Sequence, residues 1–497
     1  MRTCLKAALL LPALIVAVGS ADGKPGFSFR RIGPEAGLTA VTVFGGKATN
    51  RYLLETTGSG VAMLDFDNDG HIDLLVTYFG RNRLYHNNGR GAFDDVSERS
   101  GVRNAAARWG TGCAFLDYDR DGLLDMFIAN YIDLDLATAP TRDSGLCKYK
   151  GVPVACGPPG LKGGSNVLLH NRGDGSFADV SDASGITKAN GSYGLGVSTL
   201  DFDNDGWIDL YVANDSNPSA LYRNRHDGTF EDIGVRAGCA YSQDGKPQAG
   251  MGVGIGDFDR NGWLDILKTN FAGDTTSLYA NTGGRFCEDR TFDSGLGLNS
   301  RWLGWGAGFA DFDNDGWLDI FLTNGHVYPE VRRINTEAGY EQRKVVYRNV
   351  GGQFEDVTER LGPPATVPKA GRGTAFGDLD NNGTVDVAIN NVHETPDVFL
   401  TAAPPEHHWL VMTLVGTVSN RSAIGARIKV VTGDVAQLRE VQGGGSYISQ
   451  NDLRVHVGLG AAAAADRIEV RWPNGREERW LAVKANRLLT LTEGQGQ

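Results

Sequence analysis

Hydrophobic and polar residues alternate along most of the chain in short runs, with the two-residue period typical of β-strands. Clusters of Gly, Asp, Asn and Ser separate the runs and favour tight turns. Four runs recur in each stretch of about 50 residues, as GxGVAMLD, IDLLVTY, an LYxN segment and an FxDV segment. Helical periodicity is missing, so the pattern predicts an all-β chain built from repeated four-stranded units.

An aspartate-rich segment marks each of six copies of this unit, and two glycines stand seven and five residues before it. Four short strands repeated around a ring predict a β-propeller. The sixth copy lacks an FxDV strand, and FRRIGPEAGL from Phe29 matches it, so we expect the N-terminal segment to complete the last blade. This count gives six blades, with a seventh, degenerate blade in residues 39–57 or 131–166 as the alternative.

The aspartate segments read DFDNDGHID, DYDRDGLLD, DFDNDGWID, DFDRNGWLD, DFDNDGWLD and DLDNNGTVD. Such a loop offers side-chain oxygens at positions 1, 3, 5 and 9 and a carbonyl at position 7, a donor set that suits Ca²⁺. Position 12 is never Glu and the flanks read as strands, which excludes EF-hands. We therefore expect about six calcium ions, bound more weakly where Asn replaces Asp at position 5; plain Asx turns are the structural alternative.

The residues at positions 1, 3, 5, 7 and 9 of the six loops are the candidate metal ligands: Asp65, Asp67, Asp69, His71, Asp73; Asp117, Asp119, Asp121, Leu123, Asp125; Asp201, Asp203, Asp205, Trp207, Asp209; Asp257, Asp259, Asn261, Trp263, Asp265; Asp311, Asp313, Asp315, Trp317, Asp319; Asp378, Asp380, Asn382, Thr384, Asp386.

Composition fits this picture. Glycine contributes 68 of 497 residues, as many tight turns require, and the net charge is −12. An acidic chain without basic runs is a poor binder of nucleic acid and of anionic membranes. Acidity favours cation binding or solubility, and the aspartate repeats favour the first.

Residues 1–21 have the charged start, apolar stretch and small-residue end of a signal peptide, with an uncleaved anchor as the alternative. No later segment reaches about 18 apolar residues, so we expect a mature chain without a transmembrane segment, secreted to the periplasm or the medium. Residues 22–403 are then the propeller and 404–497 a small β-sandwich-like domain, in which Asn474-Gly475 predicts a hairpin. The alanine run before Asp466 predicts a loop or a helical turn.

Export makes at least one disulfide expected. Cys147 and Cys156 stand nine residues apart in a Gly/Pro-rich loop and are the best local pair. Cys113 lies in an apolar strand pattern and is expected to pack as a small buried hydrophobe.

Longer motifs carry a family resemblance. The repeats resemble the FG-GAP/VCBS repeats of integrin α-subunit propellers. SNRSAIGARIKV, GGGSYISQND, HVGLG and VRWPNG, in residues 419–475, resemble the ASPIC/UnbV domain. With CKYKGVPVACGPPGL and NGHVYPEV, they make the chain similar to a bacterial-type member of the cartilage acidic protein family. The resemblance implies a secreted, calcium-binding propeller with an adhesive or matrix role, and it implies no settled enzymatic activity.

Three functions compete. The first is a secreted binding module for an extracellular protein or glycan, with Trp207, Trp263 and Trp317 either as contact residues or as cover between blades. The second is a metal-dependent oxidoreductase or hydrolase in the propeller funnel, with an additional transition metal. The third is a structural role, with the C-terminal domain as an assembly module. Enzyme motifs such as HExxH and GxSxG are missing, and the weak catalytic candidates are His326, Tyr328, Arg372 and His393.

Overall fold

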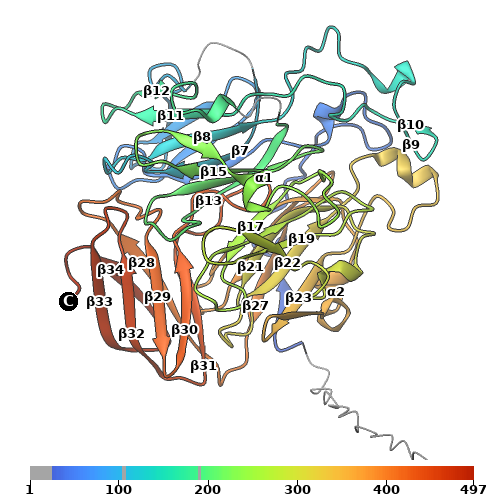
Figure 1. The fold of residues 1–497 in the computed structure, drawn as a ribbon. Helices are drawn as coiled ribbons and strands as arrows, with labels where there is room; N and C mark the ends of the chain where they lie inside the picture. The colour runs from blue at the N-terminus through green and yellow to red at the C-terminus, as the bar shows by residue number, and fades with distance from the viewer. Residues whose placement is uncertain (1–24, 103–107, 189–191) are drawn as a thin grey trace, which may run out of the picture.

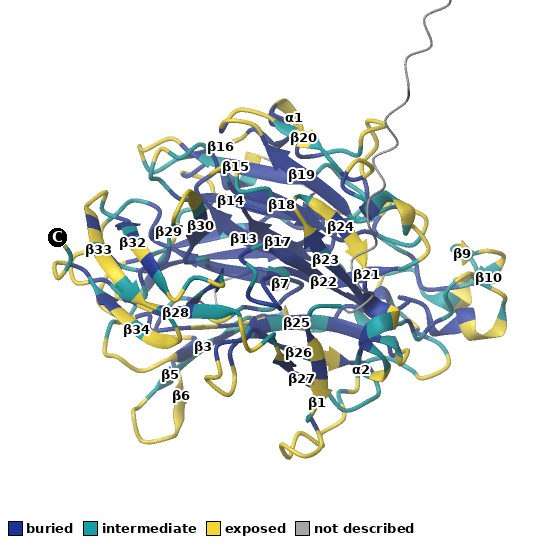
Figure 2. Ribbon diagram, turned by 90° about the horizontal axis from the view of Figure 1, so that it is seen from below, coloured by how far each residue is buried: buried dark blue, intermediate teal, exposed yellow. Residues whose placement is uncertain are grey.

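The computed structural model describes residues 25–102, 108–188 and 192–497, so the predicted signal peptide lies outside the described residues. Each of the six repeats forms one antiparallel four-stranded sheet, as the sequence predicts. The second sheet gains a short fifth strand, β4 (Phe79–Gly80), at its inner edge. Figure 2 shows that strands such as β7, β13 and β17 lie in the buried middle of the molecule, whereas exposed loops surround them.

The innermost strands are β2 (Val61–Leu64), β7 (Arg108–Leu116), β13 (Gly194–Leu200), β17 (Val253–Gly256), β21 (Gly304–Ala310) and β25 (Gly371–Gly377). The second strands are β3 (Asp73–Val76), β8 (Asp125–Asn130), β14 (Asp209–Asn214), β18 (Asp265–Lys268), β22 (Asp319–Asn324) and β26 (Asp386–Asn391). The third strands are β5 (Arg83–Asn87), β11 (Val167–Asn171), β15 (Ala220–Asn224), β19 (Ser277–Asn281), β23 (Val345–Val350) and β27 (Asp397–Ala402). The outer strands are β6 (Phe93–Asp95), β12 (Phe177–Asp179), β16 (Phe230–Asp232), β20 (Cys287–Asp289), β24 (Gln353–Asp356) and, from the N-terminus, β1 (Ser28–Arg31).

The N-terminal strand completes the last blade, which confirms the expectation drawn from Phe29. Strand β1 pairs antiparallel with β27, and Phe29 lies opposite Thr401. The Phe29 ring is buried and lies 5.7 Å from that of Phe399. Six blades result, and the alternative of a seventh is wrong. Residues 39–57 form one short helical turn, and residues 131–166 carry only a helical turn and the two-residue strands β9 (Lys148–Tyr149) and β10 (Val152–Pro153).

Neighbouring blades approach each other through the second glycine of the first five Gly-x-Gly pairs. A Cβ atom on Gly112 would lie 2.3 Å from the carbonyl oxygen of Leu195 in the next blade, and one on Gly252 would lie 2.0 Å from that of Trp305. Gly60 and Gly196 face the next blade in the same way. Because only glycine lacks a Cβ, these positions set how closely the innermost strands pack.

The sixth such glycine, Gly373, faces a different part of the chain. A Cβ there would lie 2.7 Å from Ser449 Oγ and 3.3 Å from the carbonyl oxygen of Tyr447. Both residues belong to a segment of the C-terminal domain, residues 442–452, that we call the central segment. The central segment therefore takes the place between the sixth and first blades where the direct contact of two innermost strands would be.

The central segment also contacts the innermost strands of the other blades. It forms β-bridges from Gly444 to Ser198 and from Ser446 to Val253. Its side chains bond to further innermost strands: Gln450 Oε1 accepts the Met63 N–H at 2.7 Å, Ser446 Oγ accepts the Ala307 N–H at 3.2 Å and Asn451 Oδ1 accepts the Phe376 N–H at 3.2 Å. Tyr447 is fully buried, and its ring lies 4.7 Å from that of Trp305.

In four blades, an asparagine of the third strand forms a hydrogen bond to the preceding blade. Asn224 Nδ2 donates to the carbonyl of Tyr118 at 2.8 Å, and Asn281 Nδ2 donates to that of Phe202 at 2.8 Å. Asn171 and Asn349 make the equivalent bonds to the preceding blade. This residue is the asparagine of the LYxN pattern. Its side-chain amide donates a hydrogen bond to a carbonyl group of the preceding aspartate loop, which lies outside the strand ladders.

The C-terminal domain consists of two β-sheets, drawn in orange and red in Figure 1. The three-stranded sheet has the order β31-β28-β34, with β28 and β34 parallel, and the four-stranded sheet has the order β30-β29-β32-β33. Their bounds are β28 (His408–Val415), β29 (Arg427–Thr432), β30 (Val435–Glu440), β31 (Val455–Gly460), β32 (Ala464–Arg471), β33 (Glu477–Lys484) and β34 (Arg487–Thr492).

Strands β32 and β33 pair antiparallel on either side of Asn474-Gly475, which confirms the predicted hairpin. The expectation of a loop or helical turn is wrong for the second half of the alanine run, because strand β32 begins at Ala464. Ala465 pairs with Val483 and is fully buried, so tertiary packing overrides local propensity there.

Helices are short: α1 (Gly234–Ala237), α2 (Pro363–Thr366) and the 3₁₀ turns η1 (Leu53–Glu55), η2 (Arg142–Ser144), η3 (Ile186–Lys188), η4 (Leu296–Leu298), η5 (Pro329–Arg333) and η6 (Thr358–Leu361). Within the described ranges, no helix has the length and apolar character needed to cross a bilayer. Cys147 and Cys156 form the predicted disulfide, Cys239 and Cys287 form a second one, and Cys113 is a buried free thiol.

Replacing Gly252 by Ala should destabilise the ring, because the new methyl group would overlap the Trp305 carbonyl. We expect a loss of about 1–3 kcal/mol in the free energy of unfolding, measured by urea denaturation. Gly157→Ala is the matched control, since the nearest atom would be 3.7 Å away. Equal stability of the two variants would contradict the close approach of the blades.

Candidate functional site

The six aspartate loops share one backbone geometry. The residue at position 4 has a positive φ, for example 60° at Asn68 and 61° at Arg120, and so does the glycine at position 6. The first aspartate accepts the N–H of that glycine in every loop, as in the 3.1 Å bond from Gly122 to Asp117 Oδ2. The ninth residue accepts two backbone N–H groups, one from position 2 and one from the third strand, as Asp125 does from Tyr118 and Asn171.

This geometry brings carboxylate oxygens together. Within single loops, ligand atoms of Asp117, Asp119 and Asp121 lie within 4.8 Å of one another. The sets Asp65, Asp67, Asp73 and Asp201, Asp203, Asp209 do the same. Each of these three loops thus places three of its predicted ligand side chains around a common point.

Four loops leave the same buried oxygen without a hydrogen-bond partner. This atom is Oδ1 of the first aspartate, in Asp65, Asp117, Asp201 and Asp311. Each of these residues is at most 5% exposed. A buried carboxylate oxygen without a donor is costly, and a bound cation would satisfy it.

The two loops with Asn at position 5 differ. Asp257 Oδ1 accepts the N–H of Asn261 at 2.9 Å, and Asp378 Oδ1 accepts that of Asn382 at 3.1 Å. Their first aspartate therefore already has partners for both oxygens. The prediction that these two loops bind metal more weakly thus gains a geometric reason.

Crowding and burial make the carboxylates hard to ionise. Burial, with the neighbouring Asp125 and Asp121 charges, raises the pKa of Asp117 to about 7. Burial also raises the pKa of Asp73 and of Asp257 to about 6. A divalent cation would offset this repulsion directly.

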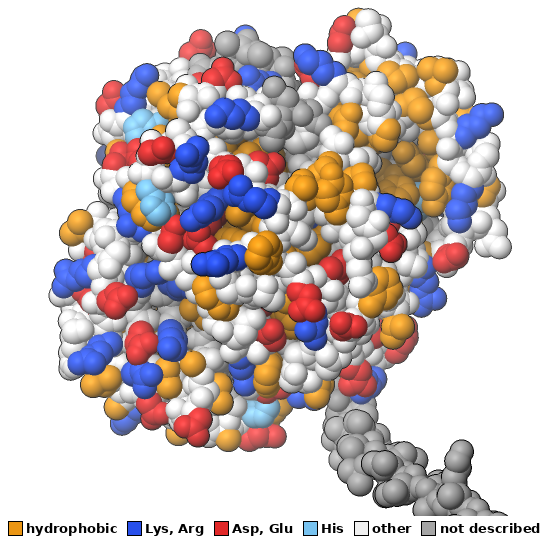
Figure 3. Space-filling model, viewed as in Figure 1, with side chains coloured by type: hydrophobic (Ala, Val, Ile, Leu, Met, Phe, Trp, Pro, Cys, Tyr) orange, Lys and Arg blue, Asp and Glu red, His pale blue; other side chains and the backbone are white. Residues whose placement is uncertain are grey.

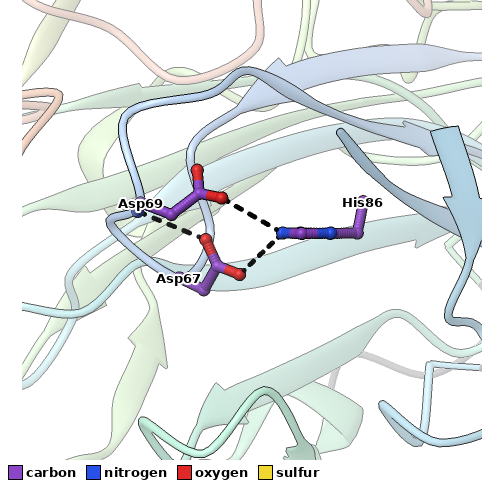
Figure 4. A group of neighbouring side chains, drawn as sticks. All are labelled: Asp67, Asp69 and His86. Atoms are coloured by element: carbon purple, nitrogen blue, oxygen red, sulfur yellow. Dashed lines mark hydrogen bonds and ion pairs between the residues drawn. The ribbon is translucent and has the colours of Figure 1, made fainter. Parts of the chain in front are cut away.

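Basic side chains from the third strands also reach the loops, which the sequence analysis missed. His86 Nε2 lies 3.1 Å from Asp67 and 3.3 Å from Asp69, and Figure 4 shows both carboxylates directed at the ring. Arg223 Nε lies 2.7 Å from Asp203, and Arg348 lies 2.8 Å from Asp313. These residues occupy the variable position of LYxN, the signal that could have identified them.

The C-terminal domain docks on the same loops. Arg427 Nη1 lies 3.3 Å from Asp201, which Arg471 also contacts, and Arg421 lies 3.5 Å from Asp65. His456 Nε2 lies 3.1 Å from the carbonyl of Gly383. The acidic ends of the blades are therefore partly neutralised by the basic face of this domain.

Tryptophans at loop position 7 pack between blades. Arg120 of the second loop lies 4.0 Å above the ring of Trp207 in the third, and Arg260 lies 3.7 Å above Trp317. Trp263 is half-buried beside Gly284. This arrangement supports the role of cover between blades.

A cavity of about 370 Å³ opens at the other ends of the blade strands, and we call it the funnel cavity. Its lining includes Leu195, Met251 and Trp305 from Gly-x-Gly segments, and Tyr131, Asp215, Phe271 and Tyr328 from the ends of second strands or just beyond them. Figure 3 shows hydrophobic side chains gathered on this part of the surface, near the segment that carries β9 and β10.

Three of the four weak catalytic candidates lie in this cavity or contact its lining residues. Tyr328 lines it. His326 is buried beside the ring of Tyr149, accepts the Tyr328 N–H at Nδ1, and has its pKa lowered to about 3 by burial and by Arg372. Arg372 is buried, stacks on Trp305 at 4.1 Å and donates to carbonyls, including that of Thr56 at 3.0 Å.

His393 has its own surroundings, with a pKa lowered by burial and by Lys47 and Arg332. A cationic side chain near each histidine opposes a transition metal at either one. The structure thus gives no support to a metal held by His326 and His393 together.

Comparisons with known proteins agree with this architecture. Residues 416–497 match the ASPIC and UnbV family, and residues 65–128, 154–212 and 201–268 match the FG-GAP-like repeat. Cartilage acidic protein 1 of Xenopus tropicalis is 28% identical over 445 residues, covering 84% of this chain and 61% of that protein. The Homo sapiens protein is 27% identical over 463 residues, covering 90% and 61%. The chain thus spans about three-fifths of the length of these relatives.

Among solved structures, an Agrocybe aegerita lectin that recognises non-reducing terminal N-acetylglucosamine is 18% identical with a TM-score of 0.35, covering 67% of this chain and 75% of the lectin. Trypanosoma rangeli sialidase with 2,3-difluorosialic acid is 8% identical with a TM-score of 0.38, covering 76% and 59%. Scores this low say nothing about the function of this chain. The chain carries FG-GAP-like repeats followed by an ASPIC/UnbV domain, and it is homologous to cartilage acidic protein 1.

Proposed function

We propose that the protein is a secreted, calcium-stabilised β-propeller that acts as a binding module for an extracellular protein or glycan. The main support for calcium binding is the Oδ1 atom of the first aspartate in four loops, which is buried and has no hydrogen-bond partner among the described residues. Calcium supplies the missing positive charge at oxygen ligands and holds each inner hairpin in one geometry. The homology to cartilage acidic protein 1 supports a non-catalytic binding role.

Calcium and the C-terminal domain act on the same end of the blades. In the third loop, Arg427 and Arg471 contact Asp201 Oδ2, whereas Oδ1 of that residue has no donor. Metal and arginine can therefore share one carboxylate. The second loop is the cleanest place for a test, because Asp117 has no arginine or lysine partner among the ion pairs of the described residues.

Elemental analysis of the mature protein, purified without chelator, tests the proposal most directly. We expect calcium as the main metal, in at most six equivalents per chain and at least the four that match the unpartnered oxygens. Asp117→Asn should remove about one equivalent and lower the melting temperature in calcium buffer, because a neutral amide is a weaker ligand for Ca²⁺. Calcium content unchanged in this variant would contradict the assignment of the second loop.

Without calcium, the same substitution should have the opposite effect on stability. The pKa of Asp117 is about 7 in the folded protein and 3.8 ordinarily, so the folded state holds this proton more tightly than the unfolded chain. The ionised group therefore destabilises the fold above pH 7, and protonation relieves this as the pH falls through 7 towards 4. In chelator at pH 8 we expect Asp117→Asn to be more stable than the parent by about 2–4 kcal/mol, an advantage that shrinks as the pH falls below 7 and disappears by about pH 4.

Urea denaturation of parent and variant at each pH measures this difference, and effects of other titrating groups cancel between the two. Asp244→Asn, at an exposed position, is the control and should show no pH-dependent difference. An advantage of Asp117→Asn that stays constant from pH 8 to pH 5 would show that the carboxylate does not titrate in this range.

A further inference from the structure

The funnel cavity contains a carboxylate, Asp215, that forms no ion pair with a basic residue in the part of the chain that the structure describes. Asp215 follows strand β14 and lines the cavity. One of its oxygens accepts the hydroxyl of Tyr131, and the other accepts that of Ser216 at 2.8 Å. Both donors are neutral, so the charge of Asp215 is solvated by hydroxyl groups but not balanced. Burial raises the pKa of Asp215, and the hydrogen bonds from Tyr131 and Ser216 oppose this rise.

Aromatic rings surround this carboxylate. Tyr131, Phe271, Trp305 and Tyr328 all line the cavity. Further rings behind them fix their orientation: Trp109 lies 4.9 Å from Tyr131, and Tyr447 of the central segment lies 4.7 Å from Trp305. The faces of such rings carry negative potential and attract cations.

Among the described residues that line the cavity, none is Lys, Arg or His. A second carboxylate, Asp274, also lies in the lining, but Lys268 and Lys246 outside the lining balance part of its charge, so Asp215 is the less balanced of the two carboxylates. Arg372 lies behind Trp305 and directs its guanidinium to carbonyl oxygens of Thr56, Gly371 and His326. A volume of about 370 Å³ admits the end of one extended side chain or a small ligand.

We propose that the funnel cavity binds an alkylammonium group, from a free amine or from a lysine side chain of a protein partner. The ammonium would pair with Asp215, and its methylene or methyl groups would contact the aromatic rings. A neutral sugar would also find acceptors and rings here, but it would leave the carboxylate unbalanced. This proposal rests on the proposed binding function and specifies its chemistry.

Titration calorimetry on the calcium-loaded mature protein tests the proposal with four probes. Nα-acetyl-lysine methylamide represents a protein lysine, and trimethylamine, which is protonated at neutral pH, represents a free amine. Nα-acetyl-norleucine methylamide is the neutral isostere, and N-acetylglucosamine represents a sugar. We expect saturable binding of one or both ammonium probes, at least tenfold tighter than binding of the norleucine probe. Binding of trimethylamine alone would point to a free amine as the source, and binding of the lysine probe would point to a protein partner.

Asp215→Asn should weaken ammonium binding at least tenfold, whereas Asp244→Asn, the same change at an exposed position, should leave it unchanged. The comparison of lysine and norleucine probes on the parent protein needs no variant, so the proposal stays testable if Asp215→Asn folds poorly. Equal affinity for the lysine and norleucine probes would indicate an apolar pocket without charge recognition. Binding of N-acetylglucosamine alone would indicate a sugar site, and absence of any binding would exclude a small-ligand site. Each of these three outcomes would overturn the proposal. Metal content and calcium-dependent melting are measured independently of ligand binding. Absence of ammonium binding would therefore not contradict the calcium sites. Absence of calcium would not prevent interpretation of the binding experiment.

Discussion

The close approach of one blade to the next through glycine is the constraint on which the rest of this structure depends. At Gly112 and Gly252 the backbone of one innermost strand lies against a carbonyl of the next, with no room for a methyl group. This packing sets the spacing of the ring at one end of the strands and so determines the size of the funnel cavity there. At the other end, the same strands lead into the aspartate loops. The positions of both candidate sites therefore depend on the repeated glycine contact between innermost strands.

The two ends of the ring handle charge in different ways. At the loop end, carboxylates are concentrated, and arginines of the C-terminal domain such as Arg427 and Arg471 neutralise part of the charge. At the funnel end, the Asp215 carboxylate accepts hydroxyl groups of Tyr131 and Ser216, and no Lys, Arg or His is among the described residues that line the cavity. Arginines of the chain therefore pair with carboxylates at the loop end, whereas Asp215 has neutral hydrogen-bond donors. This difference is the reason that we propose metal ions at the loops and a cationic ligand in the funnel.

Sequence reasoning captured whatever is local and repeated. The six blades, the N-terminal closing strand and the loop geometry follow from turn residues and two-residue periodicity, signals that each copy reinforces. The Asn474-Gly475 hairpin is equally local. Contacts between distant segments carry no such signal: nothing near Tyr447 indicates that it packs on Trp305, and nothing near Asp215 marks it as a cavity residue. His86 could have been found from its recurring position in LYxN, because that position faces the loops in several blades.

The central segment has a consequence for how the chain reaches its final form. Residues 442–452 occupy the gap at Gly373 and bond to innermost strands that begin as early as Val61. The chain leaves the ribosome or a translocation channel with its N-terminus first, so all six blades emerge before the piece that joins the last to the first. Up to that moment the pairing of β1 with β27 joins the last blade to the N-terminal segment, but the space at Gly373 is still unfilled. A chain cut short after its sixth blade would therefore contain all the repeats and the closing strand, but it would lack the segment that packs against the innermost strands of the ring.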